Sequence, residues 1–182
     1  MRLFFNYKTV QDYAVQIYQA DTISKPKEVL DKRSEAILLL VAIDTGLMIT
    51  DLLNLRHSDI EGDILTANVN RLNKAVKYTL SSVTAKHLLN YKQWRKASNM
   101  GSHLVFNNVV TGKAYSRQWA YNRVDIANSS GSLGRYRKNV GASRILRATA
   151  ARRVYDLTND LDKAQAFLGI ARKAAAKKIL AL

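Results

Sequence analysis

The side chains with the clearest chemical potential are the Lys and Arg residues near the C-terminus. Residues 134–182 hold twelve of them against three Asp and no Glu, a net charge of +9 within the +15 of the whole chain. A solvated helix surface normally interleaves both signs of charge, so this excess is typical of a surface that binds a polyanion. We therefore expect a nucleic acid as the partner. The twelve cations are Arg135, Arg137, Lys138, Arg144, Arg147, Arg152, Arg153, Lys163, Arg172, Lys173, Lys177 and Lys178.

Other kinds of chemistry have few residues to support them. The sequence has no Cys, and His57, His87 and His103 stand at no spacing that metal sites use, so we expect neither a metal nor a cofactor. No apolar run approaches the roughly 20 residues that span a bilayer, and no signal-peptide pattern opens the sequence. We expect one domain over residues 1–182, in the cytoplasm and without a membrane partner.

The first third of the sequence has helical periodicity. Apolar residues predict a helix over residues 8–19 within an N-terminal segment 1–24. Pro26, with Ser24 as its cap, predicts a second, short helix. Residues 33–45 are apolar nearly all round and predict a separate core helix that Gly46 ends.

In the middle of the sequence the residue pattern changes from helical spacing to alternation. A short helix is expected over residues 50–55, and the alternating, β-branched segments 64–69 and 76–80 predict a small hairpin. Helical spacing returns over residues 82–97, and a brief strand is expected at 104–106 before a turn at Gly112.

The remaining residues predict a basic loop and four helices. Ser116 is expected to cap a helix that ends at Ala127, and the Ser-, Gly- and Arg-rich residues 128–141 predict a loop. Ser143 and Asp160 then cap helices ending near Tyr155 and Gly169, and residues 172–181 form the last helix.

Four segments in this order resemble the motifs of the tyrosine recombinase (phage integrase) catalytic domain. Residues 44–60, with Thr45-Gly46-Leu47 and Leu55-Arg56, resemble the threonine-glycine-leucine box, and the hairpin follows. Residues 106–116 and the following Arg117-Gln118 are similar to the segment before the middle helix of that family. Residues 144–149 match the histidine-x-x-arginine box, and Phe167-Leu168-Gly169 matches the leucine-glycine step. The resemblance covers about residues 25–180 and implies a mainly α fold with a small β-sheet, of the α+β class.

The resemblance implies a specific chemistry. In this family a tyrosine hydroxyl attacks a phosphodiester, two arginines and two further donors hold the nonbridging oxygens, and a hairpin lysine protonates the leaving oxygen. Such a site works because guanidinium groups stabilise the negative charge that gathers on a phosphate in the transition state. It needs no metal or cofactor.

Carried over residue by residue, the resemblance leaves this chemistry incomplete. Met48 stands where the first arginine is expected, Arg144 replaces the box histidine, and Arg147 is the second arginine. The hairpin lysine is either Lys74 or a position held by Arg71. Ile170 stands where a histidine or tryptophan is expected, and the nucleophile position falls near Ile179.

No tyrosine follows Leu168-Gly169 in the sequence, the last being Tyr155. Tyr155 lies eight residues after Arg147, which turns it about 80° away on a shared helix, so we interpret it as a packing aromatic. We also interpret Arg56 as a structural ion-pair partner of Asp59.

Three functions remain open at this point. The sequence favours a DNA-binding regulator or accessory factor of a phage or mobile element, with a recombinase-like fold but no catalytic residues; the alternative is an integrase catalytic domain that acts in DNA integration and site-specific recombination. A third possibility is a protein-interaction module whose C-terminal helix docks on a neighbouring copy to form a homo-oligomer, as the resemblance implies for the last helix of the family. The resemblance also implies the cytoplasm of a bacterial host cell as the location. The expected contacts to double-stranded DNA are Arg71, Lys74, Arg117, Arg135, Arg137, Lys138, Arg144, Arg147, Arg172 and Lys173.

Overall fold

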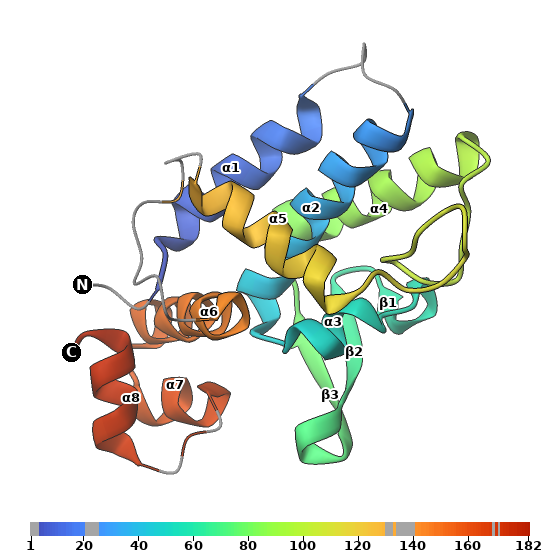
Figure 1. Cartoon of the computed structure of the whole chain (residues 1–182). Coiled ribbons are helices and arrows are strands. Elements are labelled where there is room, and N and C mark those ends of the chain that lie inside the picture. The colour runs from blue at the N-terminus through green and yellow to red at the C-terminus, as the bar shows by residue number, and fades with distance from the viewer. Residues whose placement is uncertain (1–3, 21–25, 130–132, 134–140, 169, 171) are drawn as a thin grey trace.

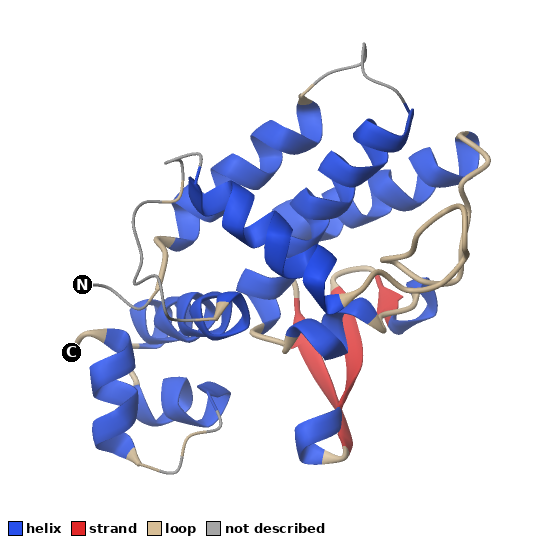
Figure 2. Ribbon diagram, viewed as in Figure 1, coloured by secondary structure: helices blue, strands red, loops and turns tan. Residues whose placement is uncertain are grey.

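The computed structural model describes residues 4–20, 26–129, 133, 141–168, 170 and 172–182 (Figure 1). Within these ranges the chain is mainly helical with one small antiparallel sheet, which confirms the predicted fold class (Figure 2). The helices are α1 (Tyr7–Gln19), α2 (Pro26–Thr45), α3 (Ile49–Leu53), α4 (Ser82–Ala97), α5 (Arg117–Ser129), α6 (Ala142–Thr158), α7 (Leu161–Leu168) and α8 (Lys173–Leu180). None of the helices in the described ranges is long and apolar enough to cross a membrane.

Helix α2 is the centre of the fold. All residues from Ser34 to Thr45 are buried, because α1, α4, α5 and α6 pack around it. The sequence predicted a short helix at Pro26 and a separate one over residues 33–45, and this division was wrong, since one helix runs through both segments. Its first three residues, Pro26 to Glu28, are exposed while its later turns are buried on every side, so no single periodicity links the two parts.

The sheet lies against one end of this helical layer. Strands β1 (Ile60–Glu61), β2 (Ile64–Val69) and β3 (Lys74–Thr79) pair in the order β1-β2-β3, with Val69 opposite Lys74. The predicted hairpin is thus confirmed, whereas the sequence did not predict the third strand, β1. The β2–β3 hairpin points away from the layer of α1, α2, α4 and α5 and ends in a 3₁₀ turn, Asn70–Leu72 (Figure 1).

Helices α4 and α5 begin where the sequence predicted. The Ser81 hydroxyl accepts a hydrogen bond from the Thr84 N–H, and the Ser116 hydroxyl accepts one from the Trp119 N–H. The expected strand at residues 104–106 was wrong. Leu104 instead forms an isolated antiparallel bridge with Arg56, and among the described residues no ladder continues on either side of it.

Helix α6 joins two hydrophobic clusters. Ile145 and Leu146 belong to the large core around α2, whereas Ala148 and Ala151 pack in a smaller, alanine-rich cluster with α7 and α8. Tyr155 packs against this second cluster, in agreement with its interpretation as a packing aromatic.

Two of the predicted boundaries near α6 were wrong. Gly141 precedes the helix at the N-cap position and Ser143 is buried inside it, so Ser143 is not the cap. The predicted loop 128–141 begins too early, since Asn128 and Ser129 are still in α5. Asp160 does cap α7, with its carboxylate accepting hydrogen bonds from the Asp162 and Lys163 N–H groups.

Candidate nucleic-acid interface

Met48 and Arg147 line one cavity together with the β2–β3 hairpin. The cavity has a volume of about 170 Å³. Residues 99 positions apart in the sequence meet here, since the Arg147 Nη1 lies 3.2 Å from the Met48 sulfur. Most of the wall is apolar. The lining residues are Thr45, Gly46, Leu47, Met48, Asp51, Val69, Leu72, Val76, Tyr78, Arg147, Ala166 and Phe167.

Gly46 brings α7 against the segment that carries Met48. Its φ of +62° ends α2 in the left-handed conformation, which a glycine adopts without a Cβ penalty. A Cβ at this position would lie 2.6 Å from the Phe167 Cε1, so the absence of a side chain also permits the approach of α7. Phe167 contacts Tyr78 of β3 edge to face, with ring centroids 6.5 Å apart, and thus joins α7 to the hairpin.

Asp44 fixes α6 relative to α2 and so positions Arg147. Its carboxylate is wholly buried and accepts hydrogen bonds from the Tyr7 hydroxyl at 2.6 Å, the Ser81 N–H at 2.7 Å and the Arg153 guanidinium at 2.5 Å. Burial, with a further contribution from Asp44, raises the pKa of Tyr7 to about 12, so this hydroxyl remains a donor at neutral pH.

Arg147 is held by the protein itself. Its Nη2 donates to the Leu168 carbonyl at 2.7 Å, which satisfies a free carbonyl at the C-terminus of α7. The Ser143 hydroxyl lies 3.5 Å from the Met48 sulfur. Sequence analysis missed both Ser143 and the Leu168 carbonyl. Nothing in the sequence could have identified them, because these contacts join segments far apart in the chain.

The electrostatics of the cavity differ from those of a phosphate cradle. Arg147 and Asp51 are the charged residues among those that line it, and Asp51 accepts a hydrogen bond of 2.7 Å from the Asn70 side chain. A thioether has no charge and no strong donor. A phosphate in this cavity would therefore meet one guanidinium, one thioether and one carboxylate.

The hairpin brings the two candidate lysine positions to the edge of the cavity. Lys74 is exposed at the first residue of β3, next to the 3₁₀ turn that contains Arg71. Val69, Leu72 and Val76, on either side of these residues, line the cavity.

The other predicted DNA contacts fall into three groups. Arg144 lies one turn before Arg147 on α6 and is exposed, as are Arg117 at the start of α5 and Arg172 before α8. Lys173 is exposed but forms a 2.6 Å ion pair with Asp162, which reduces its availability. Arg135, Arg137 and Lys138, like Ser24 and Gly169, lie outside the described residues.

The positions that should complete the chemistry are aliphatic. Ile170 is half-buried against the second cluster, and Ile179 is buried within it. Arg56 and Asp59 are joined by a hydrogen bond of 2.8 Å from the Arg56 backbone N–H to the carboxylate, and the described residues contain no ion pair between their side chains. The described residues also include no cluster of three or more metal-binding side chains.

The fold as a whole is similar to the folds of several solved structures. No protein-family model matches the sequence, and no curated protein matches it. The fold is similar to XerH site-specific recombinase bound to the palindromic difH substrate in a post-cleavage complex (TM-score 0.73, 18% identity, 97% of this chain and 48% of that chain). It is also similar to XerA recombinase (TM-score 0.73, 17% identity, 100% and 61%). A third similar structure is the Tn1549 transposon integrase in complex with a circular intermediate DNA (TM-score 0.62, 12% identity, 93% and 58%).

The chain thus spans about half to three-fifths of the length of these proteins. At such low identity the likeness concerns the fold rather than the site. The order α2, hairpin, α4 to α8 is that of the tyrosine recombinase catalytic-domain fold.

Proposed function

We propose that this protein binds double-stranded DNA through the surface that carries Arg144, Arg147 and the tip of the β2–β3 hairpin, and that it does not cleave this DNA. The observation that carries the proposal is the contact between Arg147 and Met48. The resemblance assigns Met48 to the position of an arginine, so the guanidinium that should share the phosphate with Arg147 is replaced by a thioether.

DNA as the partner is supported by charge and by the similar folds. The chain carries +15, and Arg144 and Lys74 are exposed next to Arg147 and the hairpin. XerH and the Tn1549 integrase were solved with a difH substrate and with DNA respectively. A regulatory or accessory role in a phage or other mobile element fits a fold of this kind that binds without cutting.

The loss of cleavage rests on two positions inside the chain. Met48 supplies no positive charge, and Ile170 supplies no hydrogen bond from its side chain. Removal of one preorganised donor typically slows a reaction about a hundredfold or more, and both losses act on the same transition state. The alternative, an active integrase catalytic domain, would need a nucleophile at a position other than the one that follows the leucine-glycine step in the family, and would also need to work with one arginine.

Binding is tested by fluorescence anisotropy with a duplex of about 30 base pairs at several salt concentrations. We expect log K to fall with log salt at a slope of about −4.5 or steeper, because five or more neutralised phosphates each release about 0.9 counterion. A flat plot would contradict DNA binding.

Cleavage is tested with nicked suicide substrates that trap covalent protein–DNA intermediates. We expect no adduct from the wild-type protein at any salt concentration that permits binding. An adduct that resists boiling in detergent would favour the integrase alternative, and its loss in Tyr155→Phe would identify the nucleophile. Met48→Arg serves as a control, because tighter DNA binding by this variant with no adduct would separate phosphate affinity from cleavage.

A further inference from the structure

We propose that the pocket between the first turns of α2 and α5 binds a small organic anion with a flat apolar body, such as an aryl carboxylate or a nucleoside monophosphate. This inference does not rest on the proposed DNA binding. None of the residues that line this pocket also lines the cavity of Met48 and Arg147.

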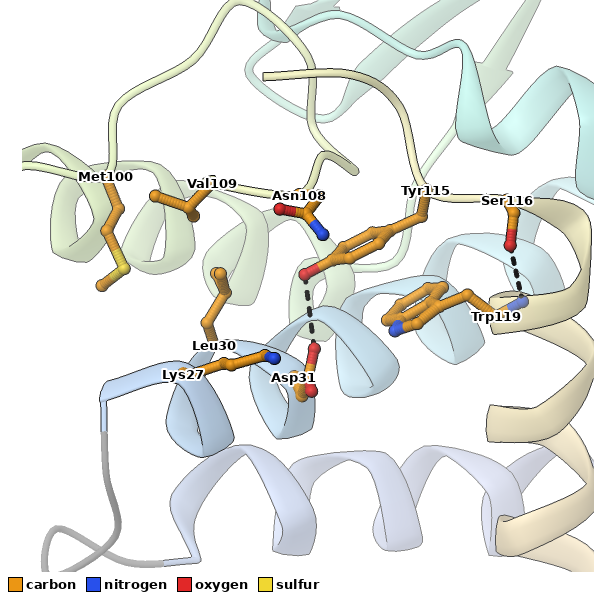
Figure 3. Close-up of a pocket in the computed structure, with 9 residues that line it drawn as sticks. All are labelled: Lys27, Leu30, Asp31, Met100, Asn108, Val109, Tyr115, Ser116 and Trp119. Atoms are coloured by element: carbon orange, nitrogen blue, oxygen red, sulfur yellow. Dashed lines mark hydrogen bonds between the residues drawn. The ribbon is translucent and has the colours of Figure 1, made fainter. Parts of the chain in front are cut away.

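The pocket is large enough for a ligand of this kind. Its volume is about 490 Å³, within the range of small-molecule sites. Its walls come from α2, from the connection between α4 and α5, and from the first turn of α5 (Figure 3). The lining residues are Lys27, Leu30, Asp31, Met100, Asn108, Val109, Tyr115, Ser116 and Trp119.

The acceptors in this pocket are already occupied by donors of the protein. The two oxygens of Asp31 accept from the Tyr115 hydroxyl at 3.3 Å and from the Arg123 guanidinium at 3.1 Å. The Asn108 Oδ1 accepts from two backbone N–H groups, those of Val110 and Thr111. Arg123 also offsets the negative charge of Asp31, so this carboxylate does not leave the pocket acidic.

Three other donors of the pocket, by contrast, are free among the described residues. Within the part of the chain that the structure describes, the Lys27 ammonium and the Asn108 Nδ2 have no hydrogen-bond or ion-pair partner, and the buried Trp119 indole N–H has none either. The two backbone donors to the Asn108 Oδ1 fix the orientation of the amide, so its NH₂ group is the end left free. A ligand that fills this pocket must therefore supply acceptors, and the cation at Lys27 favours an anionic one.

The apolar part of the pocket favours a flat body. Tyr115 and Trp119 stack with ring centroids 3.9 Å apart and an angle of 5° between the rings, which builds a rigid aromatic wall. Leu30, Met100 and Val109 line other parts of the same space (Figure 3). A planar group can bury its faces between these side chains while its acidic group reaches Lys27 and Asn108.

The experiment titrates the whole chain with 1-naphthoate and, separately, with adenosine monophosphate, and follows heat release and Trp fluorescence. We expect at least one of the two anions to bind with a Kd below about 1 mM, and uncharged 1-naphthylmethanol to bind at least about tenfold more weakly than naphthoate. Binding of naphthoate alone identifies a carboxylate ligand, and binding of the nucleotide alone identifies a phosphate ligand. If neither anion binds at 1 mM, the proposal is wrong.

Two variants place the binding in this pocket. Asn108→Asp keeps the oxygen that accepts from Val110 and Thr111 but replaces the free NH₂ with a second anionic oxygen, so we expect at least a tenfold loss of affinity. Lys27→Met, at the exposed rim, should give a similar loss and tests the same point if Asn108→Asp does not fold. Lys86→Met, outside the pocket, is the matched control for charge and should leave the affinity unchanged. Equal affinity in all three variants would overturn the proposal.

Discussion

Cationic side chains have different surroundings in two regions of this molecule. In the layer formed by α2, α4 and α5, Arg95 is 1% exposed and donates to the carbonyls of Met100, Leu104 and Val105 and to the Asn107 side chain. On the surface formed by α6 and the hairpin, Arg144 and Lys74 are exposed, and within the described residues nothing pairs with them.

This difference separates cations that hold the fold together from cations that are free to bind an anion. A buried guanidinium must have its hydrogen bonds made within the protein, because an unpaired buried charge is strongly destabilising. An exposed guanidinium is hydrated and contributes little to the stability of the fold. The protein therefore loses little stability when such a guanidinium binds a phosphate instead of water. The net charge alone does not distinguish the two groups.

The largest effect is expected at Arg95. Arg95→Met leaves three backbone carbonyls and one side-chain amide without their donor, so the free energy of unfolding should fall by about 3 kcal/mol or more. Urea denaturation measures this change. Lys96→Met, next to it and exposed, is the control and should change the stability little. A small effect at Arg95 would mean that this region does not depend on its buried cation.

The next effect concerns the packing beneath the candidate interface. Gly46→Ala adds a Cβ 2.6 Å from Phe167 at a φ of +62°, so the free energy of unfolding should fall by about 2 kcal/mol or more. Gly62→Ala is the matched control, because its φ is +60° but, apart from the two neighbouring residues in the chain, no described residue has an atom within 4 Å of the added Cβ. The difference between the two variants measures the contact with α7. Equal losses of stability would show that α7 moves aside at no cost.

A pair of arginine variants tests the comparison directly. Arg123→Met removes ion pairs to Asp31 and Glu35 at 3.1 and 3.8 Å, so it should lower the stability by about 1 kcal/mol and leave the DNA affinity unchanged. Arg144→Met should do the opposite, with a loss of DNA affinity of several-fold to tenfold and an unchanged melting temperature. Anisotropy and thermal melting measure the two quantities. If both variants lose stability and affinity together, the two regions are not functionally distinct.

The smallest effect is a dependence of stability on pH. Burial, with smaller contributions from Arg95 and Lys92, lowers the pKa of His57 to about 4, whereas an unfolded histidine titrates near 6.5. Between these values the unfolded chain binds a proton that the folded chain does not, so stability that is present above about pH 6.5 is lost as the pH falls towards 4. His57→Gln should reduce this loss in urea titrations at pH 7 and pH 5. An identical loss in the variant would mean that other groups cause it.

Much of the fold could be predicted from local sequence. Helix α4 has the predicted bounds, because Ser81 supplies a cap and the apolar residues after it keep helical spacing. Gly46 and the hairpin strands were likewise found, since a left-handed C-cap and an alternating pattern are local signals. Helix α2 was divided in two, because a helix buried on every side has no amphipathic pattern.

The sequence by itself determined which residue types the chain carries and where. These include the excess of cations, a Met at position 48, an Ile at position 170, and no tyrosine after Tyr155. Only the tertiary structure decided which of these residues meet. The contacts of Arg147 with Met48 and with the Leu168 carbonyl, and the burial of Ser143, depend on how α6 packs against α2 and α7. The physical reason is that local patterns encode hydrogen bonds between near neighbours, whereas the surroundings of a side chain are set by the packing of segments that are distant in sequence.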